Sequence, residues 1–389
     1  MPSTVPRTSK PMRFAEFFAG IGLVRMGLER AGWSCVFAND IDQTKQRLYE
    51  VNFKDPSGHF RLGDVGEVRA GEVPDIELAT ASFPCTDLSL AGRGDGLDGA
   101  QSSAYWSFLR IIDEMGDRAP RRVLLENVPA LLRSNGGDDF GRVVQSLNEL
   151  GYLADAMVLD ARWFVPQSRP RLFIVAERGG NATPATPDAP TRARPLRLIE
   201  AINANADLGW SVVDLPEPPQ RSRERLKQLV ARVEREASED LEHAWWSDKR
   251  QAYLRSQLSP AHARYADEHV GKRTWTYATV FRRMRCAPGS DRASSRAELR
   301  TDGLAGCLRT PKGGSAKQIL VKMGYGRFMV RYLTPRECAQ LMGADDFVIP
   351  DDVTDNQALF GFGDAVCVPA ITWLAEHRLN TPVPAHAHA

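Results

Sequence analysis

A cysteine stands between an apolar run and a glycine-rich stretch. The run at 76–83 predicts a strand, Pro84 and Cys85 follow it, and residues 91–99 read AGRGDGLDG. A cysteine at the carboxyl end of a parallel strand lies where such sheets bind ligands, and a mobile loop beside it can close over a substrate. The pattern makes Cys85 a candidate nucleophile, although a lone cysteine is more often buried and inert.

Charged side chains accompany two later apolar runs. Glu126 ends the run that begins at Val123, where a partly desolvated carboxyl could share a proton with a substrate nitrogen. The alternative is a glutamate that interacts with the backbone N–H groups of a helix start. Arg169 and Arg171 occupy alternate positions entering the run at 172–176, so they share one face and could bind phosphate or carbonyl oxygen. Ion pairing at the surface would also explain them.

A glycine turn follows the first apolar run. The stretch Phe17–Leu23 holds Gly20 and Gly22, and such a turn lets a ligand approach the backbone closely. Asp40 comes twenty residues after Gly20, where a carboxylate would hold the ribose hydroxyls of an adenosine cofactor. The glycine pattern is incomplete, so a tight strand–helix turn without a ligand is the alternative. The absence of a Walker lysine argues against a nucleoside triphosphate. Asp64 could bind the adenine edge or serve only in a turn.

The elements that must position these residues alternate in type. Through the first 180 residues, short apolar runs alternate with amphipathic segments near 23–31, 42–51, 104–115 and 140–150. This alternation predicts an α/β fold with a mostly parallel, doubly wound sheet covered by helices on both faces. After a linker at 179–195, a charged amphipathic helix is expected over 221–243. Apolar residues become frequent again from about residue 328, and Thr334 and Glu337 have the spacing of a helix capping box. The tail is therefore expected to rejoin the first domain.

Composition bounds the class of protein. The chain has 389 residues, 43% of them hydrophobic, with a formal net charge of +1, which indicates two to three globular domains. The six cysteines are scattered without a CxxC pair, so we expect no metal site and no disulfide framework. A reducing cytoplasm is the default compartment. No apolar run approaches the roughly 18 residues of a membrane span, and the first residues lack the apolar core of a signal peptide.

Charge is segregated along the chain. Residues 191–330 hold 26 Lys and Arg against 16 Asp and Glu, a net charge of +10, whereas the remainder holds 24 against 33, a net charge of −9. A basic segment inserted in an acidic body is typical of a polyanion binder. A solvated basic surface is an equally good interpretation of the charge alone.

Taken in order, the motifs resemble those of the DNA (cytosine-5)-methyltransferase family of bacterial and phage type. The matching stretches are FAGIG (18–22), FPC (83–85), ENV (126–128), QSRPR (167–171), RYLTPRECAQLMG (331–343) and FGFGDAV (360–366). The resemblance implies a Rossmann-like, S-adenosylmethionine-dependent methyltransferase domain formed by residues 1–190 and 325–389. Residues 191–324, which include most of the basic segment, would then be a smaller inserted target recognition domain.

The resemblance also implies a mechanism at cytosine C5. Cys85 would attack C6 of a flipped-out cytosine and form a covalent adduct, while protonated Glu126 would hydrogen-bond N3. Arg169 would bind the cytosine O2 and help to position Cys85, with Arg171 as a further catalytic residue. S-adenosylmethionine would supply the methyl group and leave as S-adenosylhomocysteine. The base that removes the C5 proton is not identified by the sequence.

Cofactor and DNA contacts follow from the same resemblance. The expected cofactor-binding residues are Phe18, Ala19, Gly20, Ile21, Gly22, Asp40, Ile41, Asp64, Val65, Pro84, Ala104, Gly363, Asp364 and Ala365. The expected DNA-binding residues are Ser89, Arg93, Arg309, Lys312 and Lys317. Three positions depart from the family pattern, because many relatives have Gly-Asn-Ser where this chain has Gly363-Asp364-Ala365, and a larger apolar residue at Ala104.

Double-stranded DNA is the expected partner, together with cognate restriction or defence-system proteins, and the protein is expected to be a cytoplasmic monomer without membrane contact. An RNA methyltransferase is one alternative, but the Cys-Phe-Thr signature of the tRNA branch is missing from the sequence. A DNA-binding relative with a dead site is a second, and intact Cys85, Glu126 and Arg169 argue against it. A nicotinamide dehydrogenase is a third, and it explains neither the Pro-Cys motif nor the split domain.

Overall fold

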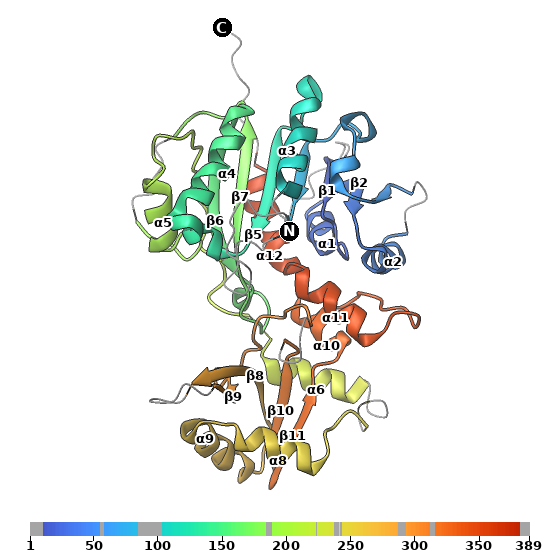
Figure 1. The fold of residues 1–389 in the computed structure, drawn as a ribbon, viewed down its shortest axis with the longest axis vertical. Helices are drawn as coiled ribbons and strands as arrows, with labels where there is room; N and C mark the ends of the chain where they lie inside the picture. Colours follow the sequence, from blue (N-terminus) through green and yellow to red (C-terminus); the bar gives the residue numbers. More distant parts are fainter. Residues whose placement is uncertain are drawn as a thin grey trace, which may run out of the picture.

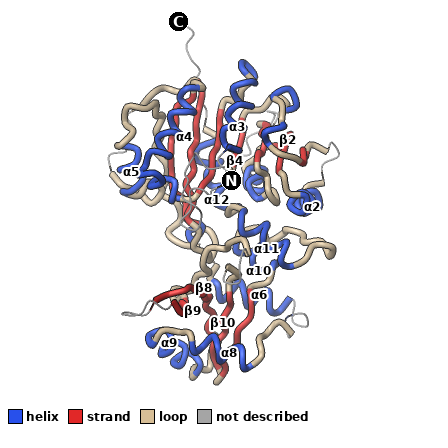
Figure 2. The backbone as a smooth tube through the Cα atoms, viewed as in Figure 1, coloured by secondary structure: helices blue, strands red, loops and turns tan. Residues whose placement is uncertain are grey.

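The chain forms two lobes, each built on its own sheet (Figure 1). The structure is a computed structural model that describes residues 11–54, 58–84, 103–183, 189–222, 224–236, 241, 243–286, 293–311 and 316–381. The larger lobe holds a seven-stranded sheet and the smaller lobe a four-stranded sheet. Figure 2 shows how helices cover the strands of both lobes.

The larger sheet has the strand order β3-β2-β1-β4-β5-β7-β6. Its strands are β1 (Arg13–Phe17), β2 (Ser34–Asp40), β3 (Phe60–Leu62), β4 (Leu78–Ala81), β5 (Arg122–Asn127), β6 (Tyr152–Asp160) and β7 (Pro170–Arg178). Only β7 runs against its neighbours, so the predicted mostly parallel sheet is confirmed. The order reverses between β1 and β4, and open α/β sheets bind ligands at the carboxyl ends of the strands beside such a switch point.

Helices cover both faces of this sheet, as the doubly wound prediction requires. One face packs against α3 (Ser103–Glu114), α4 (Asp138–Glu149) and α5 (Leu196–Asn203), and the other against α1 (Leu23–Arg30), α2 (Gln43–Asn52) and α12 (Val368–Leu374). Strand residues alternate between the two cores, since Ala15 and Phe17 face the first and Phe14 faces the second. Short 3-10 turns connect the units at η1 (Val65–Glu67), η2 (Ala70–Glu72), η4 (Gly116–Arg118), η5 (Pro129–Gly137) and η6 (Ala161–Trp163).

The smaller lobe is an antiparallel sheet with helices on both faces. Its strands pair in the order β11-β10-β8-β9, with bounds β8 (Thr276–Cys286), β9 (Ala293–Leu299), β10 (Ile319–Gly324) and β11 (Arg327–Tyr332). One face packs on α8 (Asp248–Ser256) and α9 (Pro260–Val270), and the other on α6 (Leu226–Glu236). The helix expected over 221–243 buries Leu226, Leu229, Val230 and Val233, but in the described residues it is shorter, at 226–236.

The smaller lobe begins and ends later than the predicted insert of 191–324. Leu198 and Ile202 of α5 lie in the core of the larger lobe, and Arg194 forms an ion pair with Asp155 of β6 at 2.8 Å. At the other end, β11 follows residue 324 but pairs with β10. Both differences come from tertiary contacts, which the linker-like composition at 179–195 does not reveal.

The tail returns from the smaller lobe to the larger one through α10 (Pro335–Leu341), α11 (Asp355–Asp364), α12 and η7 (Ala375–Leu379). Figure 1 shows α10 and α11 between the lobes. The capping box of Thr334 and Glu337 is confirmed. Contrary to the expectation from linear sequence, the helical segment Asp355–Leu379 is long and apolar enough to span a membrane, but 67% of its apolar window is buried inside the structure. Buried core helices of soluble proteins meet the same criterion, so the segment is weak evidence for a membrane span.

Candidate active site

A cavity of about 580 Å³ opens at the carboxyl ends of β1, β2, β4 and β5. Pockets of this size are typical of small-molecule and cofactor sites. Thirteen of the fourteen expected cofactor-binding residues line it, namely Phe18, Ala19, Gly20, Ile21, Asp40, Ile41, Asp64, Val65, Pro84, Ala104, Gly363, Asp364 and Ala365. The first part of the lining, at 18–21 and 39–41, is called the first wall below, and residues 361–366 are called the tail wall.

The first wall is shaped by a left-handed turn after β1. Phe18 and Gly20 have φ values of 56° and 57°, and the turn is fixed when the Ala19 N–H donates to the Asn39 carbonyl at 2.9 Å. Asp40 completes it, since one carboxylate oxygen accepts from the Gly20 N–H at 2.8 Å and the other from the Asp42 N–H at 2.9 Å. The wall therefore presents a buried carboxylate beside close backbone, which suits ribose hydroxyls.

Gly22 is the exception among the predicted cofactor residues. It does not line the cavity, because it faces α2 instead. A Cβ at this position would lie 2.3 Å from the Phe53 ring and 2.8 Å from the Tyr49 ring, and the φ of 81° also favours glycine. The prediction that Gly22 contacts the cofactor is therefore corrected to a packing role.

Glu126 and Arg171 form an ion pair in the lining of the cavity. The carboxylate oxygen Oε1 of Glu126 lies 2.9 Å from Nε of Arg171, and both residues line the cavity. Burial raises the pKa of Glu126, although Arg171 and Arg169 act in the opposite direction. A carboxyl with a raised pKa holds its proton more readily near neutral pH and can donate it in a hydrogen bond.

Arg169 has different surroundings from those expected. Its side chain is 1% exposed, and its guanidinium donates to the backbone carbonyls of Leu308 at 2.7 Å and Gly363 at 2.8 Å, and to that of Ala365. A guanidinium committed to three carbonyl groups is not placed to bind cytosine O2. The expectation that Arg169 contacts the base is corrected, and Arg171 is the arginine of the motif that lines the cavity.

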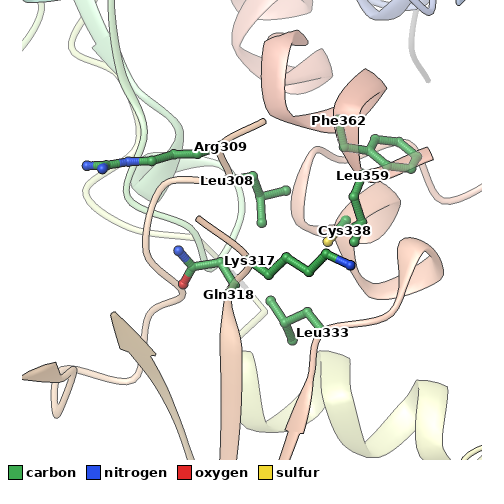
Figure 3. Close-up of a pocket in the computed structure, with 8 residues that line it drawn as sticks. All are labelled: Leu308, Arg309, Lys317, Gln318, Leu333, Cys338, Leu359 and Phe362. Carbon is green, nitrogen blue, oxygen red and sulfur yellow. The ribbon is translucent and has the colours of Figure 1, made fainter. Parts of the chain in front are cut away.

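The expected DNA-binding residues are only partly described. Ser89, Arg93 and Lys312 lie outside the described residues, as does the expected nucleophile Cys85. Arg309 is exposed and its guanidinium lies 5.4 Å from the centre of the Phe281 ring. Lys317 is half-buried and lines a small cavity between the smaller lobe and the tail, together with Leu308, Arg309, Gln318, Leu333, Cys338, Leu359 and Phe362. Figure 3 shows Lys317 pointing toward α10 and Arg309 pointing away from this cavity.

Comparisons with known proteins identify the family. The sequence matches the family described as C-5 cytosine-specific DNA methylase over residues 12–379. The chain belongs to this family. The type II methyltransferase M.DsaV of Dactylococcopsis salina is 28% identical over 373 residues, covering 95% of this chain and 87% of the relative. M.HhaI of Haemophilus parahaemolyticus is 33% identical over 168 residues, covering 43% of this chain and 49% of the relative.

Solved structures agree at the level of the fold. The crystal structure of the S. pombe Dnmt2 methyltransferase superimposes with a TM-score of 0.55 at 15% identity, covering 94% of this chain and 98% of that one. As a C-5 cytosine-specific DNA methylase, the chain belongs to a family of enzymes that use S-adenosylmethionine. The cavity fits such a group, because the Asp40 carboxylate is 7% exposed beside the apolar Ile41, which is 70% exposed.

Two residues of this methylase site were not predicted from its sequence. Lys45 of α2 lines the cavity and its Nζ lies 2.8 Å from Oδ2 of Asp364, across 319 residues of chain. Cys307 lies with its Sγ 3.3 Å from Nη1 of Arg169. Burial alone would raise the pKa of the Cys307 thiol, but Arg169 and Arg171 outweigh it and hold the pKa below its usual value. No local pattern could have found either residue, because both depend on contacts distant in sequence.

Proposed function

We propose that this enzyme transfers a methyl group from S-adenosylmethionine to C5 of a flipped-out cytosine in a specific duplex DNA sequence. The observation that carries the proposal is the Glu126–Arg171 pair, which lines the same cavity as the expected cofactor residues. This arrangement brings a carboxyl with a raised pKa and a cation together in the lining of one cavity. Pro84, the residue before Cys85, lines that cavity as well.

Cys85 is proposed as the nucleophile. Its thiolate would form a bond to C6 of the cytosine, and the electron pair displaced from the C5–C6 double bond would move into the ring. Bound S-adenosylmethionine would supply an electrophilic methyl group, which C5 would take with the ring electron pair as the S–CH3 bond breaks and S-adenosylhomocysteine leaves. Loss of the C5 proton to a base then returns an electron pair that expels the Cys85 thiolate and restores the double bond.

Glu126 and Arg171 are proposed to make the ring reactive. Burial raises the pKa of Glu126, which favours the protonated carboxyl, and in that form it would donate a hydrogen bond to N3 and take up charge pushed into the ring. Arg171, whose Nε lies 2.9 Å from Oε1 of Glu126, would bind the O2 side of the same base. This assignment replaces Arg169 with Arg171 as the arginine that faces the base.

The walls of the cavity are proposed to hold the cofactor. Asp40 would accept hydrogen bonds from the ribose hydroxyls, and Ile41, Asp64 and Val65 would surround the adenine. Pro84 and the tail wall would enclose the methionine portion. The residues present therefore account for each part of an adenosine-bearing methyl donor.

The smaller lobe is proposed to be the target recognition domain. Its basic segment suits a polyanion, and Arg309, which is exposed, would contact phosphate or a guanine edge. Extrusion of the cytosine from the stack costs a few kcal/mol, so contacts of this kind must offset it. Because relatives such as M.DsaV are named type II methyltransferases, we also propose a restriction-modification or phage-defence setting.

The test is to map methylation on a plasmid. The enzyme is expressed in cells without cytosine methylation, and the plasmid is sequenced by a method that detects 5-methylcytosine. We expect methylation at one short motif, none with Cys85→Ser, and retention with Cys286→Ser as the matched cysteine control. A folded enzyme that binds S-adenosylhomocysteine but leaves the DNA unmodified would contradict the proposal. Total RNA from the same cells is examined in parallel, because methylated RNA would identify the rival substrate.

The basic lobe gives a second, independent test. DNA affinity should fall steeply as salt rises, because each phosphate contact releases a counterion. The measurement is a titration of fluorescent duplex at several salt concentrations. A flat response would remove the support that the charge distribution lends to the recognition domain.

A further inference from the structure

The tail wall has two sides. Gly361, Gly363 and Ala365 line the cofactor cavity on one side. On the other side the wall packs against the loop of residues 304–311 in the smaller lobe, called the recognition loop here. A Cβ on Gly363 would lie 2.3 Å from the Thr310 nitrogen and 2.6 Å from the Arg309 carbonyl carbon, so the two backbones are in direct contact. One short segment therefore separates the cofactor from the residues proposed to meet DNA.

Arg169 clamps the two sides together. One guanidinium nitrogen donates to the Leu308 carbonyl at 2.7 Å, and the other donates to the Gly363 carbonyl at 2.8 Å. The side chain is 1% exposed, so these bonds lie in a buried environment where loss of a partner is costly. Neither the recognition loop nor the tail wall can shift alone without breaking them.

Gln167 fixes the same loop from a second direction. Its side-chain oxygen accepts from the Leu308 N–H at 3.0 Å, and its nitrogen donates to the Leu341 carbonyl at 2.7 Å. Gln167 is fully buried and also forms a β-bridge with Ala305. One side of the recognition loop is thus held by Gln167 and Arg169 of the QSRPR motif and by the tail wall. Arg309 of the same loop is exposed.

We infer that Arg169 and Gly363 form a positioning junction through which the occupied cofactor cavity holds Arg309 and Thr310 in place for DNA. A ligand in the cavity restrains the tail wall, and the junction passes that restraint to the recognition loop. Because coupling between two binding sites is reciprocal, DNA on the loop strengthens cofactor binding by the same factor. The inference rests on the proposed function, since it assumes that the cavity binds the cofactor and that the loop meets DNA.

The experiment measures a coupling factor, defined as the Kd for duplex DNA without S-adenosylhomocysteine divided by the Kd at its saturating concentration. The duplex carries the motif that the wild-type enzyme methylates on the plasmid. We expect a factor of about 5 or more for the wild type, the lower end of the usual range for coupled sites. Gly363→Ala should bring the factor below about 2, because the added methyl group displaces the Arg309–Thr310 backbone.

Two glycine variants serve as matched controls. In Gly361→Ala the methyl group meets Ile21 on the cavity side, at 2.6 Å, so cofactor affinity should fall while DNA affinity without cofactor stays at the wild-type value. In Gly71→Ala the methyl group meets nothing within 4 Å, so neither affinity nor coupling should change. Where Gly363→Ala does not fold, Arg169→Lys replaces it, because a lysine cannot bridge the carbonyls of Leu308 and Gly363 as a guanidinium does.

The outcomes separate the junction from the proposed function. An enzyme that methylates the plasmid but binds the duplex equally with and without S-adenosylhomocysteine overturns the junction and leaves the proposed function standing. A Gly363→Ala or Arg169→Lys variant that keeps the wild-type coupling factor also overturns it. Absence of methylation from an enzyme that binds S-adenosylhomocysteine overturns both.

Discussion

The two walls of the cavity are built in different ways. The first wall comes from residues about 20 apart in sequence, and hydrogen bonds between neighbouring strand–helix units hold it, such as the one from the Gly20 N–H to Asp40. The tail wall comes from residues more than 300 positions later. It is held by long-range contacts, among them the bond from Arg169 to Gly363 and the ion pair between Lys45 and Asp364.

This difference shows why the walls respond to different substitutions. A wall made by one strand–helix unit and its neighbour forms wherever those units fold, so its side chains mainly set ligand affinity. The tail wall is formed by residues distant in sequence, so its position depends on every contact that holds the tail against the sheet. Substitutions in the first wall should therefore change binding locally, whereas those at the anchors of the tail wall should change stability as well.

The largest effect is expected at Glu126, which lines the same cavity but belongs to neither wall. Glu126→Gln removes the acidic proton but keeps a similar shape, and loss of general acid catalysis typically lowers a rate by about 10² to 10⁴-fold. We expect a loss of kcat in this range with cofactor affinity little changed. The measurement is single-turnover methylation of a radiolabelled duplex, with Glu50→Gln as the control for an exposed glutamate.

The pH dependence of the same reaction sharpens this prediction. The pKa of Glu126 is raised by burial, so the protonated form persists above the usual range and is lost as the pH rises through the shifted value. The wild-type rate should therefore contain a falling limb on the alkaline side of that value. A Glu126→Gln variant with wild-type kcat, or one with the same falling limb, would contradict the role assigned to Glu126.

The sequence predicted the first wall and much of the fold for the same physical reason. The alternation of apolar runs and amphipathic segments is local, and so is the spacing from Gly20 to Asp40, so both could be read without knowledge of tertiary contacts. The capping box at Thr334 is local as well and is confirmed. The tail residues Gly363 and Asp364 were predicted only through resemblance to the family.

Long-range contacts account for what the sequence did not predict. Arg169 and Arg171 have the same residue type and adjacent alternate positions, yet one bonds to distant carbonyls and the other pairs with Glu126. Nothing in QSRPR distinguishes them, because the carbonyls that engage Arg169 come from residues 308, 363 and 365. Lys45 was missed because its partner lies 319 residues away.

A buried carboxyl behind the first wall should make stability depend on pH. Glu16 of β1 is 2% exposed, and burial raises its pKa from 4.5 to about 8 despite the opposing effect of Arg25. Because the folded-state pKa is raised, the contribution of Glu16 is fully present below about pH 4.5 and is lost as the pH rises through about 8. Relative to Glu16→Gln, the wild type should lose on the order of 4 kcal/mol of unfolding free energy over this interval.

The measurement is urea unfolding of both proteins at several pH values between 5 and 9. Only the difference between the two curves is interpreted, because other groups titrate in both proteins. Parallel curves would show that Glu16 stays ionised in the folded protein. Glu50→Gln, on the exposed side of α2, should follow the wild-type curve.

Loss of one residue that anchors the tail to the sheet should lower the free energy of unfolding by less than the Glu16 effect. The loss should still exceed that from removing any single contact of the first wall. Arg378 of η7 is 1% exposed and pairs with Asp155 at 3.1 Å and Glu177 at 3.2 Å. Arg378→Met leaves each carboxylate with one other arginine, so we expect a loss of about 3 kcal/mol, at the lower end for a broken buried pair. Urea unfolding measures it, and the exposed pair formed by Arg47 and Asp352 supplies the control Arg47→Met, which should change stability far less.

The smallest effect is expected from one substitution made on each wall. Asp40→Asn leaves one acceptor oxygen where two backbone N–H groups now bind, so S-adenosylhomocysteine affinity should fall about 5- to 30-fold, equivalent to 1 to 2 kcal/mol. Asp364→Asn changes a half-exposed partner of Lys45, so we expect less than about fivefold. Isothermal titration of both variants measures the difference. Equal losses would show that the tail wall contributes to the cofactor as directly as the first wall, which would remove the distinction drawn between them.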